Sequence, residues 1–82
     1  MEPGWPFNNR PPNERLWALR KNGRLIECET NTHPLGQELR FYHGGDFTYA
    51  QVHPTRELAD ADAGLRRREL LELGWTEVTV SA

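Results

Sequence analysis

Residues 55–75, TRELADADAGLRRRELLELGW, decide the fold of this 82-residue chain. They follow a proline, and the hydroxyl of Thr55 is suited to accept a hydrogen bond from the free N–H groups of a first helical turn. At the other end, Gly74 provides the left-handed backbone conformation at which helices commonly stop. We therefore expect one long helix that begins at Thr55 and ends just before Gly74.

Two hairpin signals precede this helix. Asn22-Gly23 is a preferred dipeptide for two-residue turns, and it lies between runs in which apolar and polar residues alternate. The second signal, His43-Gly44-Gly45-Asp46, lies between runs rich in aromatic and β-branched residues. The sequence thus predicts an α+β fold, a four-stranded antiparallel meander with one C-terminal helix packed on one face. The expected strands are approximately 15–21, 24–30, 37–43 and 47–52.

The chain divides into three parts. Residues 1–14 are expected to form an extended arm, because their four prolines remove backbone donors and fix φ. Residues 15–75 form a single ββββα domain, and residues 76–82 form a short extended tail. Trp5 and Phe7 are unusual in such an arm, since disordered segments usually lack large apolar rings. These rings are expected either to cover an edge of the sheet or the helix, or to dock on a partner protein; plain disorder is the third alternative.

The Asn22-Gly23 turn fixes the register of the first hairpin. A two-residue turn places two pairs of apolar residues on one face of the sheet, which should be the core. The opposite face then carries charges of both signs, as is typical of a solvated sheet. The core pairs are Trp17 with Cys28 and Leu19 with Ile26.

The register of the second hairpin depends on the length of its loop. A loop of two or four residues pairs Leu39 with Ala50 and turns Val52 inward, and it also pairs Phe41 with Thr48. A three-residue loop with a glycine bulge would change which side chains enter the core, because a slip of one residue moves every side chain to the other face. We favour the even loop. It leaves four residues together on the outer face, namely Arg40, Tyr42, Phe47 and Tyr49.

This outer-face group is the main candidate site. Tyrosine and arginine concentrate in binding hot spots, because each combines a large rigid area with a directed polar end. We therefore expect a small module that binds a protein partner or a second copy of itself, since an antiparallel sheet can pair about a two-fold axis. The alternative is that the other register, the arm or the tail buries these rings as ordinary core.

The helix carries charges within its apolar sector. Asp62 and Arg66 are four residues apart and Glu69 follows three later, a spacing that predicts ion pairs. We expect their charged ends at the rim of the sheet and their stems packed on it, while an anion site lined by Arg66 is the functional alternative. At about 100° per residue, the apolar members of this sector are Leu58, Ala59, Ala63, Leu65, Leu70 and Leu73.

Composition argues against several classes of function. A formal net charge of −2 does not attract the chain toward nucleic acid or anionic membranes. No apolar stretch approaches the roughly 20 residues that cross a bilayer. The single cysteine forms no internal disulfide, so the cytoplasm is the expected location.

Catalytic and metal-binding patterns are also missing. The only serine, Ser81, lies in the predicted tail, and Cys28 is expected in the core rather than beside a base. His43 falls at one end of the meander and His33 and His53 at the other, so the three histidines do not converge. A weak site of His33, His53 and Cys28 is the alternative, but the chain has no Cys-x-x-Cys or His-x-x-x-His pair to support it. We therefore expect no enzymatic activity, no cofactor and no metal site.

Segments 16–24, 42–45, 55–59 and 73–75 together resemble a scatter of short uncharacterised bacterial proteins, in which several strands precede one helix ending in Gly-Trp. The resemblance implies a stand-alone bacterial module and identifies no functional residue. The layout also looks like three-strands-and-helix DNA-binding modules such as the arm-binding domains of phage integrases. Nucleic-acid binding through the sheet face is therefore the alternative function, although glutamates on that face would be pressed against phosphates.

Overall fold

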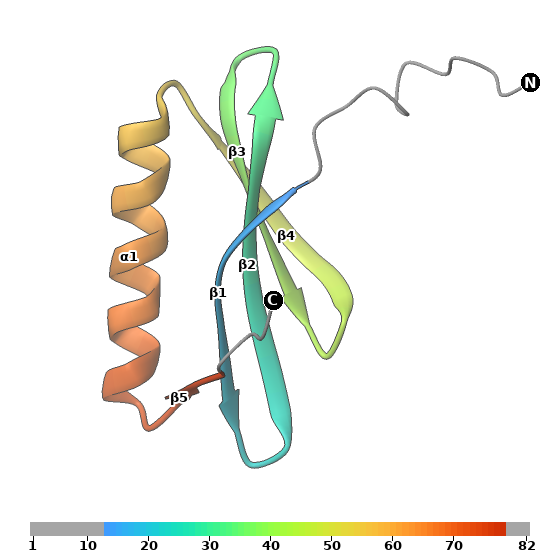
Figure 1. Cartoon of the computed structure of the whole chain (residues 1–82), viewed down its shortest axis with the longest axis vertical. Coiled ribbons are helices and arrows are strands. Elements are labelled where there is room, and N and C mark those ends of the chain that lie inside the picture. The colour runs from blue at the N-terminus through green and yellow to red at the C-terminus, as the bar shows by residue number, and fades with distance from the viewer. Residues whose placement is uncertain (1–12, 79–82) are drawn as a thin grey trace, which may run out of the picture.

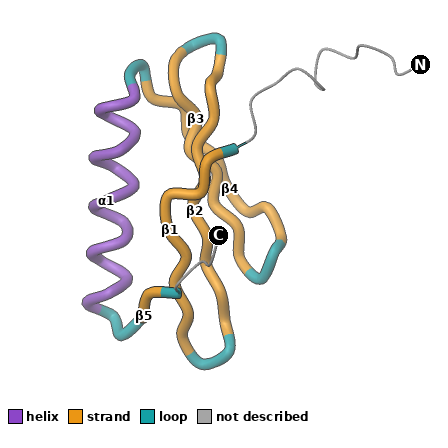
Figure 2. The backbone as a smooth tube through the Cα atoms, in the orientation of Figure 1, coloured by secondary structure: helices purple, strands orange, loops and turns teal. Residues whose placement is uncertain are grey.

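A computed structural model describes residues 13–78 as an antiparallel sheet with one helix on one of its faces (Figure 1). The sheet order is β4-β3-β2-β1-β5, so the first four strands form a meander and the fifth pairs with the other edge of β1 (Figure 2). The predicted α+β fold is confirmed, with one short strand added where a plain tail was expected. The elements are β1 (Glu14–Lys21), β2 (Arg24–His33), β3 (Gly36–His43), β4 (Asp46–His53), α1 (Arg56–Glu72) and β5 (Thr76–Glu77).

The arm prediction lies largely outside this region. Trp5 and Phe7, and most of residues 1–14, precede the described part of the chain, which begins at Asn13. The side chain of Asn13 donates to a carboxylate oxygen of Glu29 over 2.9 Å, so the first described residue is bonded to β2.

The first hairpin has the predicted register from its turn as far as Trp17, and a bulge between Arg15 and Trp17 shifts the register beyond it. Both turn residues have positive φ, 50° at Asn22 and 79° at Gly23, as a type I′ turn requires. The predicted core pairs, Trp17 with Cys28 and Leu19 with Ile26, lie opposite each other in the ladder. The buried apolar cluster between the sheet and α1 consists of Trp17, Leu19, Cys28, Leu39, Phe41, Ala59 and Ala63.

Helix α1 begins and ends where its sequence signals predict. The N–H of Leu58 donates to the hydroxyl of Thr55 over 3.2 Å, and the chain leaves the helix through Gly74 at a φ of 98°. The indole N–H of Trp17 donates to the carbonyl of Ala63 over 2.9 Å, which joins the helix to the sheet inside the core. Small side chains at the contact let the helix approach closely.

Three predicted core positions of α1 are instead exposed. Leu58, Leu65 and Leu73 keep 51%, 47% and 65% of their surface, respectively. The contact with the sheet is centred on Ala59 and Ala63, so leucines at the margin of the broad apolar sector do not reach the core.

The second hairpin combines the predicted even turn with an unpredicted bulge. Gly44 and Gly45 form a two-residue turn, which places Phe47 opposite Tyr42 on the outer face. The register then shifts by one residue, so that Tyr49 lies opposite Phe41 on the face of the helix.

The bulge overturns part of the predicted register. Leu39 lies opposite Gln51 rather than Ala50, and Phe41 lies opposite Tyr49 rather than Thr48. The extra residue exchanges the two faces, so Val52 and Ala50 face outward beyond the bulge.

Candidate interaction surface

Three of the four predicted site residues form one group on the sheet face turned away from α1, which we call the outer face. The Nε of Arg40 donates to the hydroxyl of Tyr42 over 3.0 Å. The guanidinium carbon of Arg40 lies 4.4 Å from the centre of the Phe47 ring, and the rings of Tyr42 and Phe47 meet edge to face at 5.9 Å. Arg40, Tyr42 and Phe47, the outer group, are therefore assembled before any partner binds.

Arg40 is held in place from two sides. Besides its bond to Tyr42, its guanidinium lies 3.4 Å from a carboxylate oxygen of Glu38. The hydrogen bond to Tyr42 is the main cause that raises the pKa of Arg40, with the charge of Glu38 acting in the same direction. The guanidinium of Arg40 is therefore a cation held in place over the ring of Phe47.

The apolar part of this surface is open to solvent. Phe47 is 50% exposed and Val52, on the same face of β4, is 37% exposed. Among the described residues, α1 packs on the opposite face, where Trp17 bonds to it. The aromatic group is therefore available for contact.

Around the aromatic group the outer face carries opposite charges in equal number. Arg15 and Glu27 form a salt bridge of 2.7 Å across β1 and β2. The equal number of positive and negative side chains gives this face no excess of positive charge toward phosphate groups. The charged residues on this face are Arg15, Arg20, Arg40, Glu27, Glu29 and Glu38.

Tyr49 does not belong to the outer group, contrary to the prediction. Its ring stacks on Phe41 at 5.5 Å, and the Arg66 guanidinium lies 5.3 Å from its centre. Its hydroxyl donates to the side chain of Gln51 over 2.7 Å and accepts from Arg66 over 3.4 Å. The bulge before Tyr49 turns this residue toward α1.

A polar cluster joins α1 to β4 on the inner face. The carboxylate of Asp62 binds Arg66 over 3.1 Å, as the sequence spacing predicts, and it also lies 3.0 Å from the Nε2 of His53. The Arg66 guanidinium lies over Phe41 as well, 5.0 Å from the ring centre. These groups bind one another, so the cluster fastens the helix to the edge strand. The contact of His53 was not predicted, because nothing in the sequence relates its ring to the helix.

Cys28 is a core residue, as predicted. It has no exposed surface, and burial raises the pKa of its thiol to about 12, while the charge of nearby Arg66 acts in the opposite direction. Within residues 13–78, no three metal-binding side chains lie close enough together to hold an ion. No helix in this part of the chain is long and apolar enough to cross a membrane.

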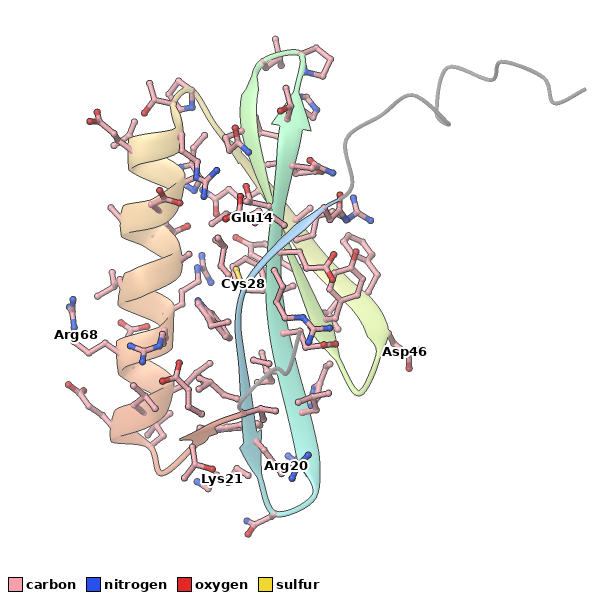
Figure 3. The ribbon with its side chains drawn as sticks, in the orientation of Figure 1. Glu14, Arg20, Lys21, Cys28, Asp46 and Arg68 are labelled. Carbon is pink, nitrogen blue, oxygen red and sulfur yellow. The ribbon has the colours of Figure 1, made fainter. Side chains whose placement is uncertain are left out.

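A shallow pocket of about 440 Å³ lies where the first hairpin meets the end of α1. It is lined by Lys21, Asn22, Arg24 and Trp75, and the ammonium of Lys21 donates to the carbonyl of Leu73. Figure 3 shows Lys21 near the tip of this hairpin, at the opposite end of the molecule from the β2–β3 turn. In the sequence Trp75 serves only as a marker of the helix end, and no pattern there predicts this pocket.

In comparisons with known proteins, no family model, no curated protein and no solved structure matches this chain.

Proposed function

We propose that this protein is a small protein-interaction module that binds its partner through the outer face of the β3–β4 hairpin. The observation that carries the proposal is the outer group itself, in which an arginine is fixed over the half-exposed ring of Phe47. The simplest partner is a second copy of the chain.

The energetic argument favours a partner that is a protein. Removing the exposed surfaces of Phe47 and Val52 from water stabilises a complex by about 25 cal/mol per Å² of apolar area. The side chain of Arg40 is already ordered by Tyr42 and Glu38, so binding costs little of its rotamer entropy. A preassembled surface of this kind has a lower cost of association than one that must be ordered.

Nucleic acid is disfavoured by the same face. Glu27, which is bonded to Arg15, and Glu38, which is bonded to Arg40, would both lie near phosphates in a complex through this face. The two arginines are therefore neutralised before a nucleic acid arrives.

Sedimentation velocity tests the proposal at concentrations up to about 1 mM, which populate weak complexes. We expect the full chain to self-associate, and we expect Tyr42→Ser combined with Phe47→Ser to abolish this association. Leu35→Ser is the matched control, because Leu35 is 76% exposed in the β2–β3 turn, outside the outer group. A monomer at the highest concentration, or equal association of all three proteins, would contradict the proposal.

A further inference from the structure

We propose that the free edge of β4 pairs antiparallel with β4 of a second copy, about a two-fold axis at Ala50, so that two sheets join into one. This inference rests on the proposed function and deepens it, because it names the second copy as the partner and gives the geometry of the contact. Four observations support it: an open edge, a matching register, a carboxylate and an imidazole at the two ends of the strand, and an exposed flank of α1.

The edge of β4 is open among the described residues. β4 is the last strand in the sheet order, and it is eight residues long. Proteins commonly protect such edges with lysine, proline or a covering element, and β4 contains no lysine or proline. Its bulge lies near the turn, which leaves residues 49–53 as a regular strand.

The alternation of the ladder places bonding groups on this edge. Hydrogen-bonded and non-hydrogen-bonded pairs alternate in antiparallel strands, and the His43–Asp46 pair closes a two-residue turn. When the pairs are counted from this one and the extra residue of the bulge is allowed for, Ala50 and Val52 belong to non-hydrogen-bonded pairs. Their N–H and C=O groups therefore point away from β3. These groups are the donors and acceptors that a new strand requires.

A pairing centred on Ala50 also matches the faces of the two strands. In that register Ala50 meets its own copy on the outer face. Tyr49 meets Gln51 of the partner subunit, and these two residues lie on the inner face. The bulge in each copy then brings Val52 opposite the partner's Phe47. Both of these side chains lie on the outer face and are exposed, so the pairing extends the outer face of one copy into that of the other.

The polar residues at the two ends of β4 also suit antiparallel self-pairing. The strand begins with Asp46 and ends with His53, and no Asp, Glu, Lys or Arg lies between them. Figure 3 shows Asp46 at the tip of the hairpin, well away from α1. In the proposed register Asp46 of each copy lies beside His53 of the other, whereas a parallel pairing would place carboxylate beside carboxylate.

Helix α1 presents apolar side chains toward the same edge. Asp62 marks the flank of the helix that faces β4, because it contacts His53. At about 100° per residue, Leu58 and Leu65 lie about 40° and 60° from Asp62, on the side away from the core. Both leucines are about half exposed, at 51% and 47%. A two-fold axis perpendicular to the sheet places both helices on one side of it, with these flanks turned toward each other.

A second copy fits this edge better than the chain's own N-terminal segment. Residues 1–12 contain prolines at positions 3, 6, 11 and 12, and proline does not donate to a ladder. The faces, the strand ends and the flanking leucines match those of a second copy, and an unrelated partner would have no reason to reproduce this match.

Disulfide trapping of the full chain tests the register directly. Under oxidised glutathione at about pH 8, Ala50→Cys should cross-link to its copy, since residues facing each other across a two-fold axis are about 5.5 Å apart at Cα. Val52→Cys is the matched control on the same face of the same strand, and its copy lies too far away for a disulfide. The native Cys28 does not interfere, because it is buried and its thiol remains protonated. We expect cross-linking of Ala50→Cys at least about tenfold faster than that of Val52→Cys.

Backbone substitution provides a second, independent test. Ala50→Pro removes the edge donor and leaves the ladder with β3 intact, because the N–H of Ala50 does not bond to β3 in this register. It should weaken self-association at least about tenfold, whereas Ala50→Thr, which keeps the N–H, should not. Circular dichroism confirms that both variants are folded.

The outcomes separate this inference from the proposed function. The protein could self-associate and lose this association in the Tyr42→Ser, Phe47→Ser double variant, while Ala50→Cys forms no cross-link. That result would support stacking of outer faces and overturn pairing of edges. Equal cross-linking at positions 50 and 52 would also overturn the register. A chain that stays monomeric up to about 1 mM and forms no cross-link would contradict both proposals.

Discussion

At the scale of single residues, Arg66 makes the most varied set of contacts on the inner face. It bonds to Asp62 and Tyr49 and lies over two aromatic rings. We expect Arg66→Ala to lower the free energy of unfolding by about 1–2 kcal/mol, since the side chain is partly exposed and its ion pair is screened. Arg66→Lys should recover only part of this, because an ammonium keeps the charge but loses the planar contact with the rings. Urea denaturation measures these differences. Arg68→Ala is the control variant, because Arg68 lies on the side of α1 away from the sheet (Figure 3).

Cys28 gives a second residue-scale prediction, in which stability depends on pH. Cys28→Ala should cost about 1–2 kcal/mol at neutral pH from lost packing. The pKa of the thiol is near its ordinary value of 9.0 in the unfolded chain, whereas burial raises it to about 12 in the folded protein. The unfolded state therefore loses a proton first, and the wild type should lose its advantage by up to about 1.4 kcal/mol per pH unit above 9. Denaturation of both proteins at pH values below and above 9 measures this; a constant difference would contradict a buried, protonated thiol.

At the scale of elements, the β2–β3 turn is locked against the end of β4 at Gly36. This residue has a φ of 142°, and an added Cβ would overlap the carbonyl oxygen of His53 and the backbone of Pro54. We expect Gly36→Ala to destabilise the protein by about 2–4 kcal/mol, because main-chain atoms must move. Gly64→Ala is the contrasting variant, since a Cβ on this helical residue meets nothing, and it should stabilise α1 by about 0.5–1 kcal/mol. Thermal unfolding of the two variants should therefore shift in opposite directions.

The elements also show what the sequence predicts and what it does not. The limits of α1 are set by local signals at Thr55 and Gly74, and the register of the first hairpin is set by its turn as far as Trp17, so both are predictable. The bulge beyond Phe47 has no such signal, because it depends on how the strand fits its neighbour, and it is the reason that Tyr49 leaves the predicted site. The short β5 likewise depends on the free edge of β1 and not on its own two residues.

At the scale of the whole molecule, the one described helix covers one face of the sheet, and no described helix covers the outer face. The order of the sheet puts the short β5 at one edge and the long β4 at the other, so the two edges differ in their capacity to bind a further strand. The outer group lies on β3 and β4, beside the longer edge. The outer group and the edge of β4 therefore form one continuous region.

Removal of residues 1–12 tests which part of the chain is needed for folding and association. We expect the truncated chain to keep its circular dichroism spectrum and cooperative unfolding, because each strand from β1 to β5 pairs within residues 14–77. Asn13 should be retained, since its side chain bonds to Glu29 and Asn31. Self-association should also be unchanged, because β4 lies at the edge opposite to β5, separated from β1 by two strands.

The full chain with Trp5→Ser and Phe7→Ser distinguishes the reasons for any loss of stability on truncation. A decrease of a few kcal/mol in both proteins would mean that the two rings cover apolar surface of the domain. A decrease in the truncated chain alone would assign the effect to the backbone of the segment, and unchanged denaturation midpoints in both would favour docking on a partner or disorder. Association that appears only after truncation would mean that residues 1–12 shield the region formed by the outer face and the β4 edge, and would contradict self-pairing by the intact protein.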